Sequence, residues 1–230
     1  MMRRIAILGW EEGLAGQVST WVEGALGAEL VCFVHPSDDF PEIDPVRAMD
    51  RPSTRFSYPQ DGLYLGKRLI IGSTWADSLA ELGIEAVVCC LADPNERRTA
   101  LEEGQSKGVT FLSAIHPSAQ CLSESSIGLG VIVEPNCYVG YKAEVGACTH
   151  LHAGSQVDHH SVIGAYVTLN PGVLIAGNVR IGDGSTVNMG AIISNRVELG
   201  NRTIVGAGSI VLKSFRAPDL LIIGTPAKLR

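Results

Sequence analysis

Apolar residues recur at every sixth position through the second half of the chain. From Ile127 to Ile210 the sequence divides into fourteen hexads without an insertion, and each hexad begins with Ile, Leu or Val. The fifth position is always small or β-branched, as at Val131, Cys137 and Ala143. An α-helix has a period of 3.6 residues, so this spacing predicts a parallel β-helix whose interior is filled by the first position.

The first half of the chain has a different pattern, in which short apolar runs alternate with helical stretches. The apolar runs predict strands at residues 3–9, 29–34, 68–72, 85–92 and 109–115. Helices are expected at residues 14–27, 77–83 and 94–108. This alternation favours a parallel sheet of the Rossmann type. The predicted fold is therefore α/β plus all-β, with a Rossmann-like parallel-sheet domain at 1–114 and a parallel β-helix at 115–230.

Composition and charge restrict the class of ligand. The 230 residues are 46% apolar and 18% charged, which is typical of a globular protein. A net charge of −6 without a run of Lys or Arg argues against nucleic-acid binding and favours small molecules. No apolar stretch approaches membrane-spanning length, so no membrane partner is expected. The six cysteines lie in apolar runs without zinc-binding spacing, which indicates reduced, buried thiols and a cytoplasmic protein.

Two loops of the predicted parallel sheet are expected to meet a ligand. Ligands of such sheets bind beyond the carboxyl ends of the strands, which here are the loops at 9–13 and 35–39. The first loop reads GWEEG. It lacks the full G-x-G-x-x-G pattern, and its two glutamates would repel a phosphate, so a dinucleotide-binding dehydrogenase is disfavoured.

Four of the six histidines lie within eleven residues, at His150, His152, His159 and His160. Such a cluster is compatible with a metal site, with proton-transfer groups or with a solvated surface. Histidine suits proton transfer because its ordinary pKa lies near physiological pH.

Several motifs resemble those of one family of enzymes. IHPSA at 115–119, VDHHSVIG and IAGNVRIG in the hexads, and the closing IGTPAK are similar to hexapeptide-repeat acyltransferases of the sialic-acid O-acetyltransferase and bacillosamine-pathway nucleotide-sugar N-acetyltransferase type. The resemblance implies a left-handed β-helix with three hexads per coil, so that residues eighteen apart lie on one face. It also implies acetyl-CoA as acyl donor, no metal, a sugar acceptor, and a homotrimer with active sites between subunits.

The eighteen-residue rule puts His159 beneath Gly177, where a glycine would leave a gap for an extended thioester arm. The family has its catalytic base at the position of His159, which would take the proton from the acceptor amine or hydroxyl. An Asp or Glu usually follows that base, whereas this chain has His160. Two neighbouring imidazoles disfavour each other's protonation, so Asp158 is considered as the alternative partner of His159.

The same resemblance implies contacts to both substrates. Those predicted for coenzyme A are His152, Thr168, Gly177, Met189, Ala207 and Lys228. His152 stands where the family has an Asn that contacts the reacting groups. Those predicted for the nucleotide of an amino sugar are Gly9, Gly13, His35, Asp38 and Asp39. Because GWEEG lacks the family's usual glycines and histidine, a free sugar or an amino acid is the alternative acceptor.

Two other classes of function stay open. Carbonic anhydrases built on the same coil bind zinc through three histidines shared between adjacent subunits, and four clustered histidines fit that class. The missing acidic neighbour of His159 instead fits a trimeric scaffold without catalytic activity.

Overall fold

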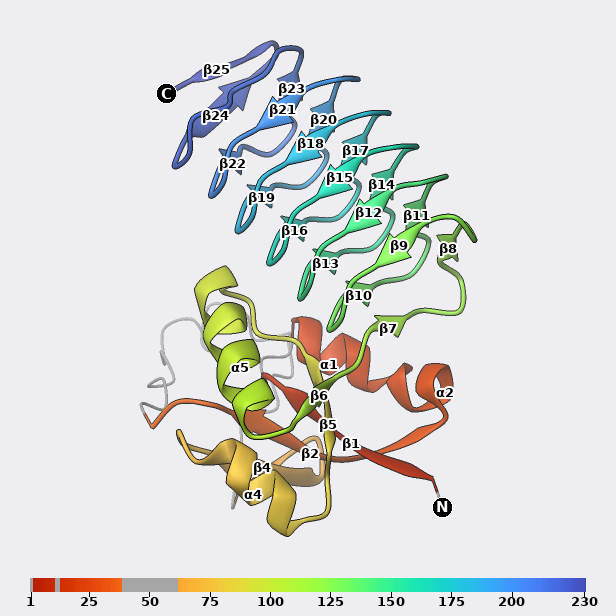
Figure 1. Ribbon diagram of the computed structural model, residues 1–230, viewed down its shortest axis with the longest axis vertical. Coiled ribbons are helices and arrows are strands. Elements are labelled where there is room, and N and C mark those ends of the chain that lie inside the picture. Colours follow the sequence, from red (N-terminus) through yellow and green to blue (C-terminus); the bar gives the residue numbers. More distant parts are fainter. Residues whose placement is uncertain (1, 11–12, 39–61) are drawn as a thin grey trace, which may run out of the picture. The chain divides into compact units, whose positions relative to one another are not determined.

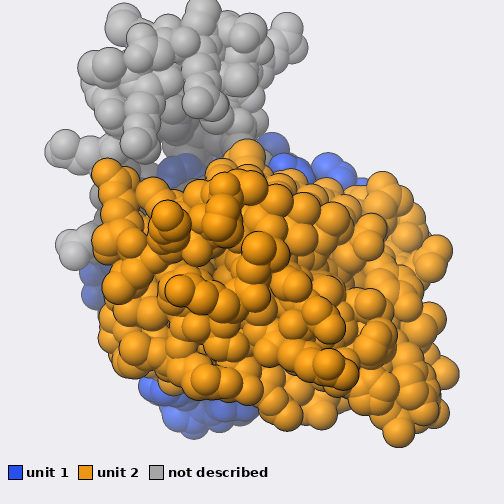
Figure 2. All heavy atoms as spheres, turned by 90° about the horizontal axis from the view of Figure 1, so that it is seen from above, with its two compact units in different colours: residues 1–92, 102–110 blue, residues 93–101, 111–230 orange. Residues whose placement is uncertain are grey.

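The computed structural model describes residues 2–10, 13–38 and 62–230, so the predicted acceptor contact Asp39 lies outside the described residues. The chain forms two compact units, which Figure 2 shows in different colours. The first unit comprises Met1–Ala92 and Glu102–Thr110, and the second comprises Asp93–Leu101 and Phe111–Arg230. Among the described residues, no helix is both long and apolar enough to cross a membrane.

The first unit is built around a six-stranded sheet with the order β3-β4-β2-β1-β5-β6. Its strands are β1 (Arg3–Leu8), β2 (Ala28–His35), β3 (Leu63–Tyr64), β4 (Lys67–Ile71), β5 (Ala86–Cys89) and β6 (Thr110–Phe111). Its helices are α1 (Leu14–Ser19), α2 (Val22–Leu26), α4 (Trp75–Glu81) and part of α5 (Pro94–Ser106). The pairs β1–β2, β1–β5 and β2–β4 are parallel, and β3 is antiparallel to β4. All four residues of β5 are buried, as the continuous apolar run in a parallel sheet requires.

The single helix predicted at 14–27 is wrong, because the structure has two short helices there. The hydroxyls of Ser19 and Thr20 donate to the carbonyls of Gly16 and Gln17, at 2.8 and 2.7 Å. Such side-chain bonds compete with the backbone ladder and favour a helix end. The chain therefore turns after α1 and starts again at Val22.

The strand predicted at 109–115 is also divided. Its first part is β6, whereas its end is β7 (Ala114–Ile115), which pairs with β10 (Ile132–Val133) in the second unit. Between them, the Ser113 hydroxyl donates to Gly128 O at 2.6 Å and accepts from Val131 N at 3.1 Å. The repeat structure thus begins at Ala114, ahead of the first hexad that the sequence pattern recognised.

The second unit is a stack of coils whose two-residue strands form three parallel sheets (Figure 1). The first sheet contains β7, β10, β13 (His150–Leu151), β16 (Thr168–Leu169), β19 (Thr186–Val187), β22 (Ile204–Val205), β24 (Leu221–Gly224) and the antiparallel β25 (Ala227–Leu229). The second sheet contains β8 (Gln120–Cys121), β11 (Tyr138–Val139), β14 (Gln156–Val157), β17 (Leu174–Ile175), β20 (Ile192–Ile193) and β23 (Ile210–Val211). The third sheet contains β9 (Ser126–Ile127), β12 (Glu144–Val145), β15 (Val162–Ile163), β18 (Arg180–Ile181) and β21 (Glu198–Leu199).

Strand register confirms the eighteen-residue stacking. His150 pairs with Thr168, and Gln156 pairs with Leu174, so each coil consumes three hexads. The first and fifth hexad positions fill the interior, as Val133 and Val131 illustrate with no exposed surface. The hexad pattern therefore predicted both the core and the vertical neighbours for residues 127–210 of this unit.

Candidate active site

His159 lies at the corner of the coil that follows β14. The carboxylate of Asp158 accepts its backbone N–H at 2.7 Å, and its side chain is about half exposed, at 49%. A Cβ added to Gly177 would lie 2.5 Å from both Cε1 and Nε2 of the imidazole. The prediction that His159 stacks beneath Gly177 is thus confirmed, but the expected gap is not there, because the ring itself fills the space.

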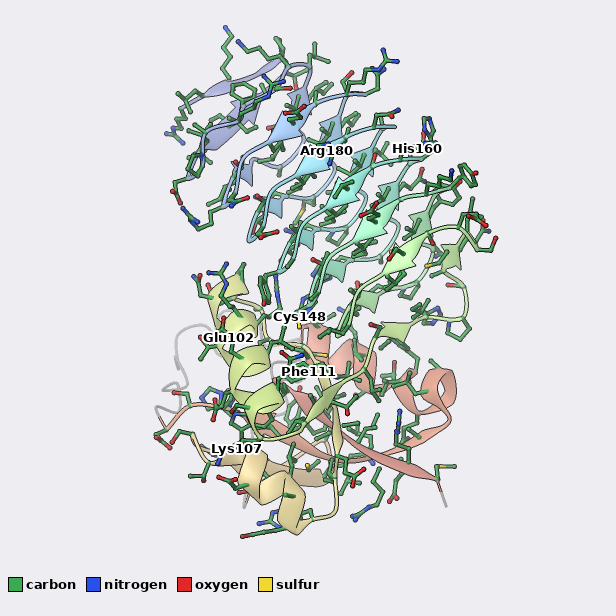
Figure 3. The ribbon with its side chains drawn as sticks, in the orientation of Figure 1. Glu102, Lys107, Phe111, Cys148, His160 and Arg180 are labelled. Carbon is green, nitrogen blue, oxygen red and sulfur yellow. The ribbon has the colours of Figure 1, made fainter. Side chains whose placement is uncertain are left out.

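His160 is the immediate partner of that ring. It has a left-handed backbone, with φ of 58°, and its Nδ1 lies 3.1 Å from Nδ1 of His159. One Nδ1 must carry the hydrogen and the other must accept it. When His160 accepts, Nε2 of His159 keeps a lone pair and can take a proton. His160 lies at the outer edge of the coil, next to the Tyr141 ring at 5.6 Å (Figure 3).

Asp158 is a weaker partner than a directly bonded carboxylate. Its Oδ2 lies 3.9 Å from Nε2 of His159, beyond hydrogen-bond distance, and its side chain is also 49% exposed. An exposed pair at this distance contributes little to the free energy of either charge state. The geometry therefore leaves His160 as the group in direct contact with the imidazole of His159.

His150 is part of a buried contact with α5. Its side chain is 1% exposed, and its Nδ1 lies 3.2 Å from Nη1 of Arg97, a fully buried residue. Nη2 of Arg97 donates to Tyr166 O at 2.7 Å and to the Thr168 hydroxyl at 2.9 Å. Since arginine only donates, Nδ1 of His150 is an acceptor here. Thr168, which was predicted to contact the cofactor, is buried in this packing of α5 against the coil.

The remaining histidine of the cluster pairs with a carboxylate that sequence reasoning missed. Nδ1 of His152 lies 3.1 Å from Oε2 of Glu134, which also accepts the backbone N–H of Ala153 at 2.9 Å. Glu134 stands eighteen residues before His152, so the hexad register contained the signal that was needed to find it. No three His, Cys, Asp or Glu side chains converge to hold a metal ion in the part of the chain that the structure describes.

The residues predicted along the C-terminal coils are exposed. Met189 is 60% exposed, and Ala207 lies at the corner one coil further on. Lys228 of β25 is exposed as well. Met189 and Ala207 therefore lie exposed at the same corner of successive coils.

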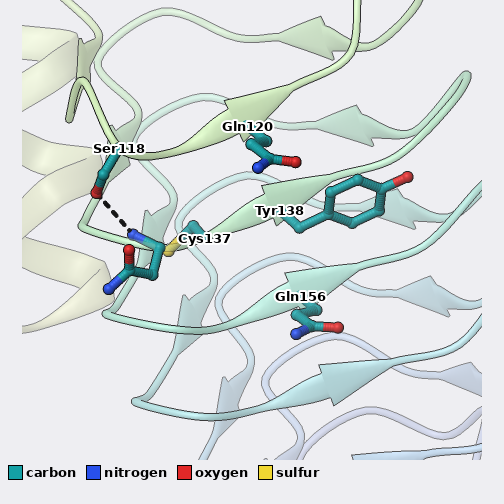
Figure 4. A pocket seen from close by; sticks show the side chains of 6 residues that line it. Ser118, Gln120, Cys137, Tyr138 and Gln156 are labelled. Carbon is teal, nitrogen blue, oxygen red and sulfur yellow. Dashed lines mark hydrogen bonds between the residues drawn. The ribbon is translucent and has the colours of Figure 1, made fainter.

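A hollow of about 400 Å³ lies on the second sheet of the coil (Figure 4). Gln120, Tyr138 and Gln156 stack along it on successive strands, and Ser118, Asn136 and Cys137 form its other side. Amides, hydroxyls and the thiol of Cys137 line it. The corner of Glu134 and His152 precedes this face in each coil, and the corner of His159 follows it.

The predicted acceptor contacts lie at the carboxyl ends of β1 and β2. Gly9 follows β1 with φ of 110°, and a Cβ there would lie 3.0 Å from Cys90 O. Asp38 accepts the backbone N–H and the hydroxyl of Ser73, at 3.0 and 2.8 Å, and these bonds lower the pKa of its carboxyl. His35 ends β2, and Gly13 precedes α1 with open space around its Cα.

Solved structures match the chain over its full length, whereas neither a protein-family model nor a curated protein sequence matches it. PerB from Caulobacter crescentus in complex with CoA and GDP-perosamine is 25% identical, with a TM-score of 0.82. A mutant GDP-perosamine N-acetyltransferase from the same organism, with the same two ligands, is 25% identical with a TM-score of 0.80. Both alignments cover 100% of this chain and 98% of the other. The chain shares the fold of a sugar N-acetyltransferase.

A third neighbour extends the likeness to another organism. The acetyltransferase domain of PglB from Neisseria gonorrhoeae in complex with acetyl coenzyme A is 24% identical, with a TM-score of 0.80 and 100% of each chain covered. At this identity the likeness concerns the fold alone. The stacked parallel strands of the second unit accordingly fit the left-handed β-helix that the resemblance implied.

Proposed function

We propose that the protein is an acetyl-CoA-dependent acetyltransferase that acetylates an amino or hydroxyl group of a sugar, most readily a nucleotide-linked amino sugar. The observation that carries this proposal is the full-length likeness to a structure that holds both CoA and GDP-perosamine. A coil corner with an accessible imidazole, His159, supports it independently.

His159 acts as the general base in this proposal. Its Nε2 takes the proton of the acceptor nitrogen or oxygen while that atom attacks the acetyl carbonyl, and the thioester bond then breaks. His160 holds the ring of His159 through the 3.1 Å contact between the Nδ1 atoms. An acceptor at Nδ1 stabilises imidazolium less than a carboxylate does, so His160 serves mainly to orient the ring.

Coenzyme A would lie along the exposed corner that carries Met189 and Ala207, with Lys228 near its phosphates. Small or flexible side chains at this corner let a pantetheine arm approach the backbone amides. The arm would run toward the end of the coil that carries the histidines. Gly177 contributes by accommodating the ring of His159, since the space beside its Cα is already filled.

The acceptor nucleotide is assigned to the first unit, which we interpret as a Rossmann-like domain within residues 1–114. The parallel strands β4, β2, β1 and β5 lie in that order, as do the first four strands of such sheets. Gly9, Gly13, His35 and Asp38 lie at the edge where these sheets bind ligands. The catalytic coil is assigned to 115–230, and the assembly to a cytoplasmic homotrimer whose buried thiols stay reduced.

The proposal is tested by a panel of nucleotide-linked amino sugars and free sugars incubated with acetyl-CoA, with release of the free thiol as the signal. We expect thiol release with at least one nucleotide-linked amino sugar and none without acceptor. A chelator should leave the rate unchanged, because His150 is engaged by Arg97 and the described residues form no metal site. Thiol release that requires zinc, or none across the panel, would contradict the proposal.

A further inference from the structure

Tyr141 is an exposed aromatic residue that the proposed mechanism does not use. It is 45% exposed, which makes it the most exposed aromatic residue in the described part of the chain. An aromatic ring gains free energy when apolar atoms cover its surface, and aromatic rings are common in the lining of small-molecule sites. The neighbours of Tyr141 therefore indicate what kind of ligand would cover it.

Tyr141 lies one coil before His159, at the same corner. The two residues are eighteen apart in the sequence, and the backbone has the same register at both levels. Tyr141 O accepts the N–H of His160 at 2.9 Å, just as His159 O accepts the N–H of Asn178 at 2.9 Å. Neighbouring strands of a sheet are about 4.8 Å apart. The exposed ring and the proposed general base therefore belong to adjacent levels of one corner.

The ring of Tyr141 is held beside the imidazoles of this corner. Its centroid lies 5.6 Å from that of His160, with an angle of 77° between the two planes. The ring of His160 lies in turn 5.3 Å from that of His159. Edge-to-face contacts of this kind restrict the orientation of a ring. A ligand about as long as the spacing of two coils would connect the imidazole of His159 with the surface of Tyr141.

Lys142 adds a positive charge at the same place. Its Nζ lies 5.2 Å from the centroid of the Tyr141 ring, and its side chain is exposed. None of the ion pairs in the described part of the chain involves Lys142. The carboxylate of Asp158, one coil further on, accepts the backbone N–H of His159 instead. The ammonium group of Lys142 is thus available to an anion that reaches this corner.

The two side chains fit different parts of a sugar that carries a phosphate. One face of a pyranose ring presents mainly C–H groups, which pack well against the face of an aromatic ring. A phosphate on the same sugar is an anion, which a lysine binds as a point charge. The spacing of the coils is close to the width of a pyranose ring. With the reacting amine or hydroxyl at His159, the sugar ring would lie over Tyr141 and its phosphate within reach of Lys142.

We propose that Tyr141 and Lys142 form the acceptor subsite, in which Tyr141 packs against the sugar ring and Lys142 binds the phosphate attached to that ring. The inference rests on the proposed acetyl transfer and narrows its acceptor to sugars that carry a phosphate, as nucleotide-linked sugars do. Free sugars and amino acids lack the group that Lys142 binds. Neither residue transfers a proton; both hold the acceptor with its reacting atom at His159.

Binding is measured first, without turnover, by calorimetry of the full chain with the nucleotide-linked amino sugars of the panel. Tyr141→Ala should weaken binding of the acceptor about tenfold, because the surface that covers the sugar is lost, whereas Tyr141→Phe should bind it as the wild type does. Lys142→Met should weaken binding by about fivefold to tenfold at low salt and by less at high salt. Lys213→Met is the matched control, since Lys213 is also exposed and lies 5.5 Å from the ring centroid of Phe215, and it should leave binding unchanged.

Kinetics with a series of substrates then identify the group that Lys142 contacts. The constant kcat/KM is compared for one amino sugar in three forms, which are the nucleotide-linked sugar, its 1-phosphate and the free sugar. Lys142→Met should lower kcat/KM about tenfold for the first two forms and leave that of the free sugar unchanged, with the KM for acetyl-CoA unaffected. A loss confined to the nucleotide-linked form would overturn the assignment of Lys142 to the phosphate next to the sugar.

Three further results would overturn the subsite. The first is wild-type binding of the acceptor in Tyr141→Ala, and the second is an equal loss for the free sugar in Lys142→Met. The third is a Tyr141→Ala protein that sediments as a smaller assembly than the wild type, because a second copy of the chain would then be what covers the ring.

Failure of the proposed function would look different. A protein that releases no thiol with any acceptor would contradict acetyl transfer, whereas the calorimetric comparison would still decide whether Tyr141 and Lys142 bind a sugar phosphate. A protein that binds no member of the panel would overturn the subsite as well.

Discussion

The ring of His159 occupies space that only a glycine leaves open. Its Cε1 and Nε2 lie only 2.5 Å from the place where the Cβ of any other residue at 177 would be, and its Nδ1 faces His160. One nitrogen therefore contacts a neighbour, and the side chain as a whole is half-exposed at the corner. This arrangement is compatible with the general-base role that we propose for His159.

Replacing His159 by Ala should lower kcat by about a hundredfold or more while the KM for acetyl-CoA changes little. A general base stabilises the transition state and contributes little to cofactor binding. Steady-state kinetics with the acceptor found in the panel will measure both constants. A near-normal kcat would remove His159 from the mechanism.

Replacing His160 by Glu should raise the rate constant of the chemical step. A carboxylate would hold the ring of His159 and stabilise its imidazolium, which the Nδ1 of a second imidazole does less well. His160→Ala should be mild by comparison. Single-turnover kinetics of both variants will show the order, and abolished activity in both would assign the proton transfer to His160 itself.

Sequence reasoning found the histidines at this scale but not the roles of all four. The spacing of hexads put His159 against Gly177, and that contact exists. Glu134 was missed because an acidic residue in a hexad reads as a solvated corner until its burial and its bond to His152 are seen. The contact of His150 could not be predicted either, because its partner Arg97 lies in a helix outside the repeat, where the eighteen-residue rule does not apply.

At the scale of elements, the repeat was predictable because its six-residue period sets both the positions of the strands and their register. Each hexad contributes one two-residue strand, and the buried first position dictates the register with no help from distant contacts. The breaks were not predictable from apolar pattern alone. The hydroxyls of Ser19 and Thr20 bond to backbone carbonyls at the end of α1, and the hydroxyl of Ser113 bonds to the backbone where the predicted strand divides.

The stacking of coils makes Gly177→Ala a sharp test of how His159 is held. The added Cβ would approach the imidazole to 2.5 Å, so the ring must move away from its present position and its contact with His160. We expect kcat to fall at least tenfold with the unfolding transition largely kept. Gly24→Ala in α2 is the control, since open space surrounds its Cα, and it should leave both activity and melting temperature near the wild type.

At the scale of the whole molecule, exposed apolar side chains on the coil indicate self-association. Leu174 and Ile192 are each 39% exposed on neighbouring strands of the second sheet, and Met189 lies at the adjoining corner. Apolar side chains that adjoin one another on an exposed face are candidates for an interface between copies of the chain. We expect a closed homotrimer, the state that the resemblance to hexapeptide-repeat acyltransferases implies.

Sedimentation should therefore give three times the 24.4 kDa mass of the chain at micromolar concentration. Ile192→Glu puts a charge on the apolar face and should shift the protein toward monomer, while Glu144→Gln on the third sheet should not. A wild-type protein that sediments as a monomer would rule out any site shared between subunits.

Three hexads per coil also restrict the lengths of insertions and deletions that the β-helix can accommodate. Loss of a single hexad between His159 and Gly177 would shift all later residues by one face of the coil, so that position 177 would no longer stand over His159. Loss of eighteen residues would shorten the stack by one coil and leave all later residues on their original faces. Insertions and deletions in the coil should accordingly be tolerated when their length is a multiple of eighteen residues, because only these keep every later residue on its original face.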